Sequence, residues 1–177
     1  KSVLRVAGAL NRGEPDKGED EVLMRAVRDF NTPKIPAVDT PIFLRLIADL
    51  FMGMEAERQV DEDLKKIVAA VAKQELLQPD ETFLIKVLQF QDLLDVRHSV
   101  MLLGPTGSGK TNIWRTLVGA HNWDTETDSY KPKKTCIYEP VNPKSVTGDE
   151  LYGFMTLAKD WKDVVLSIIM RGMSKCI

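Results

Sequence analysis

The sequence contains few of the residues that would tie a small protein together covalently or through a metal. It has two cysteines and two histidines among 177 residues. Cys136 and Cys176 are too few for a disulfide framework and are typical of a reducing compartment. Neither His98 nor His121 has a second ligand at metal-binding spacing, so both are expected at the surface or in loops. A disulfide scaffold and a histidine-bound metal are therefore not expected.

The sequence also lacks a strong charge of either sign and a long apolar run. Its net charge is −2, which provides no bulk attraction to nucleic acid or to a membrane surface. The longest apolar runs are far shorter than the ~20 residues of a membrane-spanning helix. We therefore expect no nucleic acid and no membrane among the partners. The first residues include no initiator Met and no apolar signal core, which is typical of an excised segment.

A glycine-rich loop lies between an apolar run and a helical pattern. The run 99–103 predicts a buried strand, and the loop after it reads Gly104, Pro105, Thr106, Gly107, Ser108, Gly109, Lys110 and Thr111. Glycines leave backbone N–H groups open to one anion, and the next helix directs its positive end at the same point. Lys110 can reach the outer phosphates, and Thr111 can bind Mg²⁺. The loop therefore predicts binding of ATP or ADP with Mg²⁺.

The segment after the loop continues the pattern of a phosphate-binding site. Ile113, Leu117 and Ala120 recur at helical spacing, so one face of this helix is expected to pack on the core. Trp114 is expected to pack rather than to stack on a nucleotide. Together, the run, the loop and the helix give the strand–turn–helix context that this motif requires.

A hydrolysing enzyme of this type also needs a second strand that ends in an acidic residue, which helps to hold Mg²⁺. No acidic residue after Lys110 follows four apolar residues. The chain ends about 65 residues after the loop, whereas a complete nucleotide-binding domain takes roughly 150 residues. We therefore expect a fragment with no catalytic residue of its own and negligible hydrolysis.

Helical patterns fill the chain before the loop, and shorter elements follow it. Thr40 and Asp80 are expected to cap the third and fifth helices, and Pro41 to occupy a first turn. The expected helices span 1–10, 20–30, 40–51, 61–76 and 80–94. After the loop we expect a mobile loop at 124–134, a strand at 135–138, a helix ending at 152 and a last helix at 161–173.

Several longer strings resemble the dynein heavy chains. The most specific are Met24-Arg-Ala-Val-Arg-Asp29 and Asn142-Pro-Lys-Ser-Val-Thr-Gly-Asp-Glu-Leu-Tyr-Gly153. The string from Val3 to Pro15 is most similar to the axonemal, outer-arm group. The resemblance covers nearly the whole chain. Between Ala158 and Leu166 the sequence departs from the family pattern, because Val164 replaces a glycine after Asp163. A hairpin near this point is therefore expected to differ in shape.

The resemblance implies a fold. Dynein heavy chains carry six AAA+ modules in one ring, so we expect an α/β P-loop NTPase module that is incomplete and preceded by an α-helical lid subdomain. Residues 1–56 correspond to the C-terminal part of the lid of module 1. Residues 57–177 correspond to the N-terminal part of module 2. Phe43, Leu46, Leu50 and Phe51 are expected to be buried against the half that holds the loop.

The resemblance also implies a function for the parent protein. It would be an ATP-hydrolysing, minus-end-directed microtubule motor of the cytoplasm and cytoskeleton, in the axoneme of a cilium or flagellum. Its partners would be the remaining AAA+ modules of the same heavy chain, with intermediate chains, light chains and microtubules bound through other regions. In this family the second module binds ATP at a structural or regulatory site.

Two arginines correspond to the family's sensor position for the preceding module. Arg25 is the first candidate to reach the γ-phosphate at that module's site, and Arg28, one turn later, is the second. In a chain without that site, either is expected to be solvated or to bridge the lid. The basic cluster 131–134 is expected to be a solvated loop.

Two other functions remain open at this point. The first is an unrelated P-loop ATPase or kinase, truncated after its first half. The second is a helical interaction module with a vestigial P-loop, which would have no affinity for nucleotide.

Overall fold

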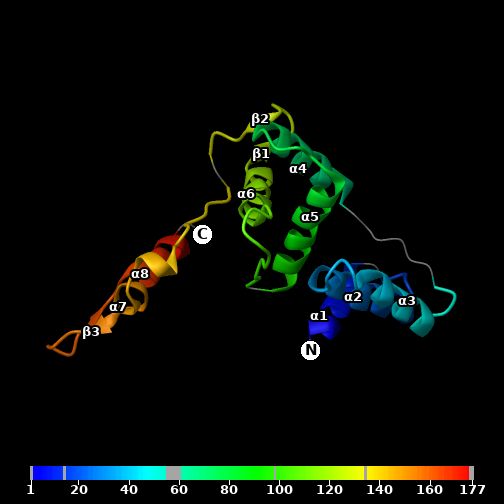
Figure 1. The fold of residues 1–177 in the computed structure, drawn as a ribbon, viewed down its shortest axis with the longest axis horizontal. Helices are drawn as coiled ribbons and strands as arrows, with labels where there is room; N and C mark the ends of the chain where they lie inside the picture. Colours follow the sequence, from blue (N-terminus) through cyan, green and yellow to red (C-terminus); the bar gives the residue numbers. More distant parts are fainter. Residues whose placement is uncertain (1, 14, 55–60, 98, 134, 176–177) are drawn as a thin grey trace. The chain divides into compact units, whose positions relative to one another are not determined.

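The computed structural model describes residues 2–13, 15–54, 61–97, 99–133 and 135–175. By its internal contacts the chain divides into two compact units, Lys1–Cys136 and Ile137–Ile177. Figure 1 shows mainly helices in the first unit and a smaller set of elements in the second. The expected boundary between residues 56 and 57 falls in 55–60, outside the described residues, and stays a prediction. Within the described ranges, every helix is too short or too polar to cross a bilayer.

The first unit begins with three α-helices and one short 3-10 helix. They are α1 (Ser2–Gly13), α2 (Glu19–Asn31), η1 (Thr32–Lys34) and α3 (Thr40–Leu50). Helix α2 packs on α1 and buries apolar residues at helical spacing, namely Val22, Met24, Ala26 and Phe30. Pro33 lies in the first turn of η1, where the N–H that proline lacks would have no acceptor within the helix. These three helices confirm the predicted ones, with α1 three residues longer.

Two details of α3 differ from expectation. Thr40 does not cap the helix: it lies inside the first turn, and its Oγ1 donates to the Pro36 carbonyl at 3.0 Å. The apolar face is also displaced. Leu46 is 55% exposed and Leu50 is also exposed, whereas Ile47 is 5% exposed. Ile47 therefore makes the buried contact of α3, and the expected burial of Leu46 and Leu50 is wrong.

Three further helices surround the main hydrophobic core. They are α4 (Glu62–Gln74), α5 (Glu81–Val96) and α6 (Lys110–His121). Asp61 caps α4 and Asp80 caps α5, each by accepting from backbone N–H groups of the first turn. The Thr82 hydroxyl, which donates to the Asp80 carboxylate, and then the Thr82 backbone N–H lower the pKa of the Asp80 carboxyl. The buried cluster consists of Val68, Leu84, Val87, Leu117 and Ala120, and Ile113 packs against it. The predicted apolar face of the helix after the loop is confirmed.

The strand predicted at 99–103 is wrong. These described residues have no regular structure, and Met101 and Leu103 are 86% and 88% exposed. A β-strand exists only when a neighbour accepts and donates the ladder of hydrogen bonds. Among the described residues, no strand lies beside this run, because the only sheets are two antiparallel hairpins. The same reason applies to the strand predicted at 135–138, which is also absent from the described residues there.

A hairpin replaces the mobile loop expected at 124–134. Strands β1 (Trp123–Asp124) and β2 (Ser129–Tyr130) pair antiparallel, with Trp123 opposite Tyr130. Their rings meet edge to face at 5.1 Å between centroids. This aromatic contact anchors the short hairpin. In its turn the Asp124 carboxylate accepts from the Glu126 N–H at 3.1 Å and from Thr127 Oγ1 at 2.8 Å.

The second unit contains η2 (Pro143–Ser145), α7 (Gly148–Tyr152), β3 (Phe154–Met155), β4 (Trp161–Lys162) and α8 (Val165–Ser174). Helix α7 ends at 152 as predicted, and a capping box between Thr147 and Glu150 starts it. The last helix begins four residues later than expected, because Trp161 pairs with Met155 in a hairpin. Ile168 of α8 is exposed.

Candidate nucleotide-binding site

The glycine-rich loop has the backbone conformation that its sequence requires. Gly107 and Gly109 have φ of +82° and +80°, a region in which side chains other than hydrogen are strained. Gly109 is the residue immediately before α6, which starts at Lys110. The two glycines therefore turn the chain sharply into a helix N-terminus. The first N–H groups of a helix have no acceptor within it, and they favour an anion.

The side chain of Lys110 folds over the same loop. Its Nζ donates to the carbonyl oxygens of Gly104 at 3.0 Å and Pro105 at 2.6 Å. Ser108 closes the turn, because its Oγ donates to the Pro105 carbonyl at 2.9 Å. Thr111, in the first turn of α6, is exposed. The Lys110 ammonium, the Thr111 side chain and the turn thus lie together at the start of α6.

These residues fit a phosphate group and its Mg²⁺. The backbone at Gly107 and Gly109 has open space where a Cβ would stand, with no heavy atom within 4 Å. A cation and the positive end of a helix lie beside this open backbone, which is the donor set that phosphate oxygens accept. The exposed hydroxyl of Thr111 is an oxygen ligand of the type that Mg²⁺ takes. Elsewhere in the described residues, no group of three His, Cys, Asp or Glu side chains could hold a metal.

The helix that carries the loop is held closely by its neighbours. Gly119 of α6 faces α4 so tightly that a Cβ would lie 2.7 Å from Val71 Cγ1. Tyr130 covers the same point, and its hydroxyl donates to Glu75 Oε1 at 3.1 Å. Burial, then the Glu75 charge and this hydrogen bond, raise the pKa of Tyr130 to about 12. The position of α6 therefore depends on a glycine and on the hairpin that follows the helix.

The two predicted sensor arginines both lie on α2. Arg25 is buried, so of the two expectations for this chain a solvated side chain is wrong, whereas a side chain that bridges the lid stays a prediction. Arg28 is half-buried, and its Nε lies 2.8 Å from Asp29 Oδ1 in an ion pair. Neither residue is a partner in the hydrogen bonds of the loop given above, so the sensor role stays a prediction.

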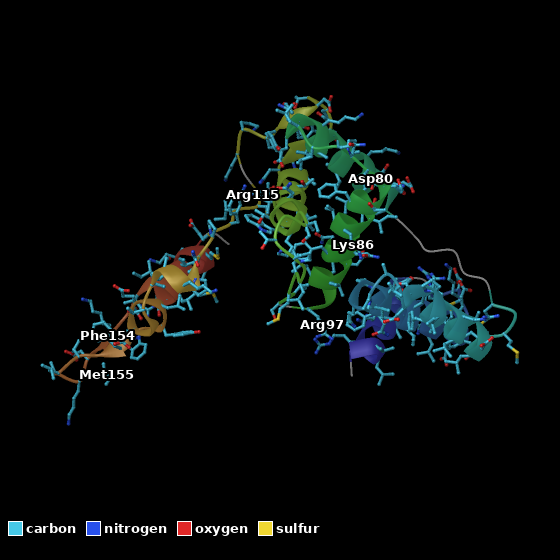
Figure 2. All side chains as sticks on the ribbon, in the orientation of Figure 1. Asp80, Lys86, Arg97, Arg115, Phe154 and Met155 are labelled. Carbon is cyan, nitrogen blue, oxygen red and sulfur yellow. The ribbon has the colours of Figure 1, made fainter. Side chains whose placement is uncertain are left out.

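Other residues of the predicted set fall into ordinary positions. Trp114 is half-buried beside Arg115, whose Cζ lies 5.4 Å from its ring centroid. His121 is exposed, and its Nε2 lies 2.9 Å from Gln91 Oε1, which confirms a surface histidine. His98 lies outside the described residues, as does Lys134 of the basic cluster. Figure 2 shows Arg115 on α6, Lys86 on α5, and Asp80 and Arg97 at the two ends of α5.

The sequence did not reveal one contact near the approach to the loop. Phe30 of α2 has two cations on its ring: Lys34 Nζ is 3.3 Å and Arg97 Cζ is 5.0 Å from the centroid. Burial, and then repulsion by Arg97, lower the pKa of Lys34. The four-residue spacing of Phe30 and Lys34 was the only signal, and Arg97 is too distant in sequence to be found by spacing. The contact joins α2 to Arg97, the residue that follows α5.

Comparison with known proteins gives a consistent match. A family profile described as "Hydrolytic ATP binding site of dynein motor region" matches residues 1–111. The ciliary dynein beta chain of Tripneustes gratilla is 45% identical over 175 residues, or 98% of this chain. Human dynein axonemal heavy chain 17 is 42% identical over the same share, and the flagellar outer-arm dynein alpha chain of Chlamydomonas reinhardtii is 41% identical. The chain spans 4% of the length of each of these relatives.

Proposed function

The chain belongs to the dynein heavy-chain family, and from this premise we propose that it is a segment of a motor ring that binds Mg-ATP or Mg-ADP at residues 104–111. The conformation of the loop carries the proposal. Two left-handed glycines lead into a helix that begins at Lys110, with the lysine ammonium over the turn. A helix N-terminus beside a cation is a site for a polyphosphate.

Most residues of the loop have a part in this proposal. Backbone N–H groups from Gly107 to Thr111 would cradle the phosphates, and Lys110 would neutralise their outer charge. Thr111 would supply a hydroxyl oxygen to Mg²⁺. The bound Mg²⁺ would neutralise part of the phosphate charge. Gly104 supports the turn, because a Cβ there would lie 2.9 Å from Ser108 Oγ.

We propose a structural or regulatory site in this segment rather than a hydrolytic one. The matched profile is described by hydrolysis, but no acidic residue after Lys110 follows an apolar strand pattern in this sequence. Without such a carboxylate the segment lacks the acidic group that would share the metal with Thr111 and help to orient water. A structural or regulatory site needs only the cradle that the loop provides.

The remaining assignments concern the parent protein. Residues 1–56 would be part of the lid of module 1, residues 57–177 part of module 2, and Arg25 a sensor for the site of module 1. The parent would be a minus-end-directed microtubule motor of the cytoskeleton. The relatives named ciliary, axonemal and flagellar support a place in the axoneme. Other modules of the heavy chain, intermediate and light chains, and microtubules would be its partners.

One observation favours the alternative of a helical module with a vestigial loop. The run 99–103 forms no strand among the described residues. The loop is therefore followed by a helix but is not preceded by the strand that the motif requires. That alternative predicts no nucleotide affinity. An unrelated kinase or ATPase has no comparable support, because the relatives match over 98% of the chain.

Isothermal titration of the 177-residue chain with Mg-ATP tests the proposal. We expect heat of binding from the wild type and from Lys86→Ala, a control that removes an exposed lysine of α5. Lys110→Ala should bind at least about tenfold more weakly, because a charged hydrogen-bond donor is lost. The same samples should release no phosphate above background. Equal heats from the wild type and Lys110→Ala would remove the loop from the account.

A further inference from the structure

The ammonium of Lys110 is surrounded by acceptors of its own loop. An ammonium has three N–H donors. Three loop oxygens lie within reach of Nζ: the Gly104 carbonyl at 3.0 Å, the Pro105 carbonyl at 2.6 Å and Ser108 Oγ at 3.5 Å. In this conformation, every donor of Lys110 has an acceptor inside the loop. Any phosphate that uses Lys110 must therefore compete with bonds that already exist.

Ser108 connects the parts of this arrangement. Its hydroxyl donates to the Pro105 carbonyl at 2.9 Å, and its lone pairs face Lys110 Nζ. Its backbone N–H approaches the same carbonyl at 3.4 Å. The Pro105 oxygen thus receives three donors although a carbonyl has two lone pairs. Ser108 Oγ also lies close against Gly104, at 2.9 Å from the place of a Cβ. One hydroxyl thus links Pro105 and Lys110.

We propose that Ser108 is a latch: a positioning residue that holds Lys110 in the closed loop and slows the opening of the site to a Mg-nucleotide. The inference rests on the proposed function, because the latch regulates the same site. The hydroxyl acts in the free loop, where it occupies a donor of Lys110. Its contribution is lost when Lys110 turns to the phosphates. The hydroxyl therefore affects association, and dissociation is independent of it.

Stopped-flow mixing of the 177-residue chain with Mg-ATP that carries a ribose fluorophore separates the two rates. Ser108→Ala removes one hydrogen bond of the closed loop, so the association rate should rise about three- to tenfold. The dissociation rate should stay within about twofold, since that hydrogen bond is absent from the bound loop. Ser108→Thr, which keeps a hydroxyl, should restore slow association. Thr125→Ala, which removes a hydroxyl from the exposed hairpin turn, should match the wild type.

A faster dissociation in Ser108→Ala, or an association rate no higher than in the wild type, would overturn the latch. The first result would mean that the hydroxyl contacts the phosphates. A wild type that does not bind would instead refute the proposed function.

A second measurement judges the closed loop without nucleotide. Nuclear magnetic resonance of the free chain should show a protected Lys110 ammonium signal in the wild type and in Ser108→Thr. This signal should be weaker in Ser108→Ala, because Nζ has lost one of its three acceptors and keeps only the carbonyls of Gly104 and Pro105. An equally protected signal in Ser108→Ala would contradict the latch whatever the binding experiment gives.

Discussion

The side-chain amide of Asn122 takes the place of a neighbouring strand for the backbone of Cys136. Its Oδ1 accepts from the Cys136 N–H at 2.8 Å, and its Nδ2 donates to the Cys136 carbonyl at 2.8 Å. The same Oδ1 accepts from the Thr135 N–H at 2.8 Å. The buried side chain of Asn122, just after α6, thus forms hydrogen bonds with backbone groups of Thr135 and Cys136, where a strand was expected. It also ties the helix that carries the loop to the end of the first unit.

Replacing Asn122 should therefore destabilise the first unit. Asn122→Ala leaves two backbone N–H groups and one carbonyl without their partner, and the free energy of unfolding should fall by about 1–3 kcal/mol. Urea denaturation followed by tryptophan fluorescence measures this change, because Trp114 and Trp123 both lie in the first unit. Asn142→Ala, an exposed asparagine of the second unit, should leave that transition unchanged. A loss below about 0.5 kcal/mol in Asn122→Ala would show that water replaces the amide freely.

Because α6 lies close to α4 at Gly119, alanine should change the free energy of unfolding in opposite directions at Gly119 and at Gly8. Gly119→Ala places a Cβ 2.7 Å from Val71 Cγ1, so unfolding should become easier by about 1–3 kcal/mol. Gly8→Ala in α1 is the matched control, because no heavy atom lies within 4 Å of its new Cβ. Alanine is the better helix former, so that variant should gain up to about 1 kcal/mol. Chemical denaturation of both variants should give changes of opposite sign, and a common sign would refute the tight approach.

Tyr130 gives the first unit a dependence on high pH. Its pKa is raised from 10.0 to about 12, first by burial and then by Glu75. A raised pKa means that the fold favours the neutral phenol. Its stabilising contribution is therefore complete below pH 10 and is lost as the pH rises through 12. Tyr130→Phe should show a smaller loss of unfolding free energy between pH 10 and 12 than the wild type. Tyr152→Phe, an exposed tyrosine, should follow the wild type, and coincident curves for all three proteins would contradict the assignment.

In helix α3, Ile47 is buried and its neighbour Leu46 is exposed, so the same substitution should have different effects at these two positions. Ile47→Asp places a charge in the packed side of α3 and should cost several kcal/mol, about 3 or more. Leu46→Asp lies on the exposed side and should change the free energy of unfolding by about 0.5 kcal/mol or less. Thermal denaturation of the isolated chain compares them. A larger loss in Leu46→Asp would revive the expectation that this face is buried against the half with the loop.

Local sequence signals predicted the features that depend on nearby residues. The helix after Asp61, the cap at Asp80 and the apolar face of Ile113, Leu117 and Ala120 are all present. In each case the partners lie within a few positions or on one helical face. The loop conformation also followed from its own residues, since Gly107 and Gly109 adopt positive φ.

The features that the sequence predicted wrongly, or did not predict, depend on partners far away in the chain. A run such as 99–103 becomes a strand only beside another strand, and apolar composition cannot supply one. The backbone of Cys136 forms hydrogen bonds with the side chain of Asn122, and a strand pattern in the sequence cannot predict such a partner. The hairpin of Trp123 and Tyr130 has only two residues in each strand, too few for alternation to be recognised. The cations on Phe30 were missed because Arg97 is remote in sequence.

The most direct test of the account is a titration of the ¹⁵N-labelled chain with Mg-ATP, observed at the backbone amides. The amide signals of Gly107 to Thr111 should shift most, because these N–H groups would receive the phosphates. The shifts should persist in Lys86→Ala and weaken in Lys110→Ala. Loop amides that do not move, or that move equally in Lys110→Ala and the wild type, would contradict a nucleotide site at residues 104–111.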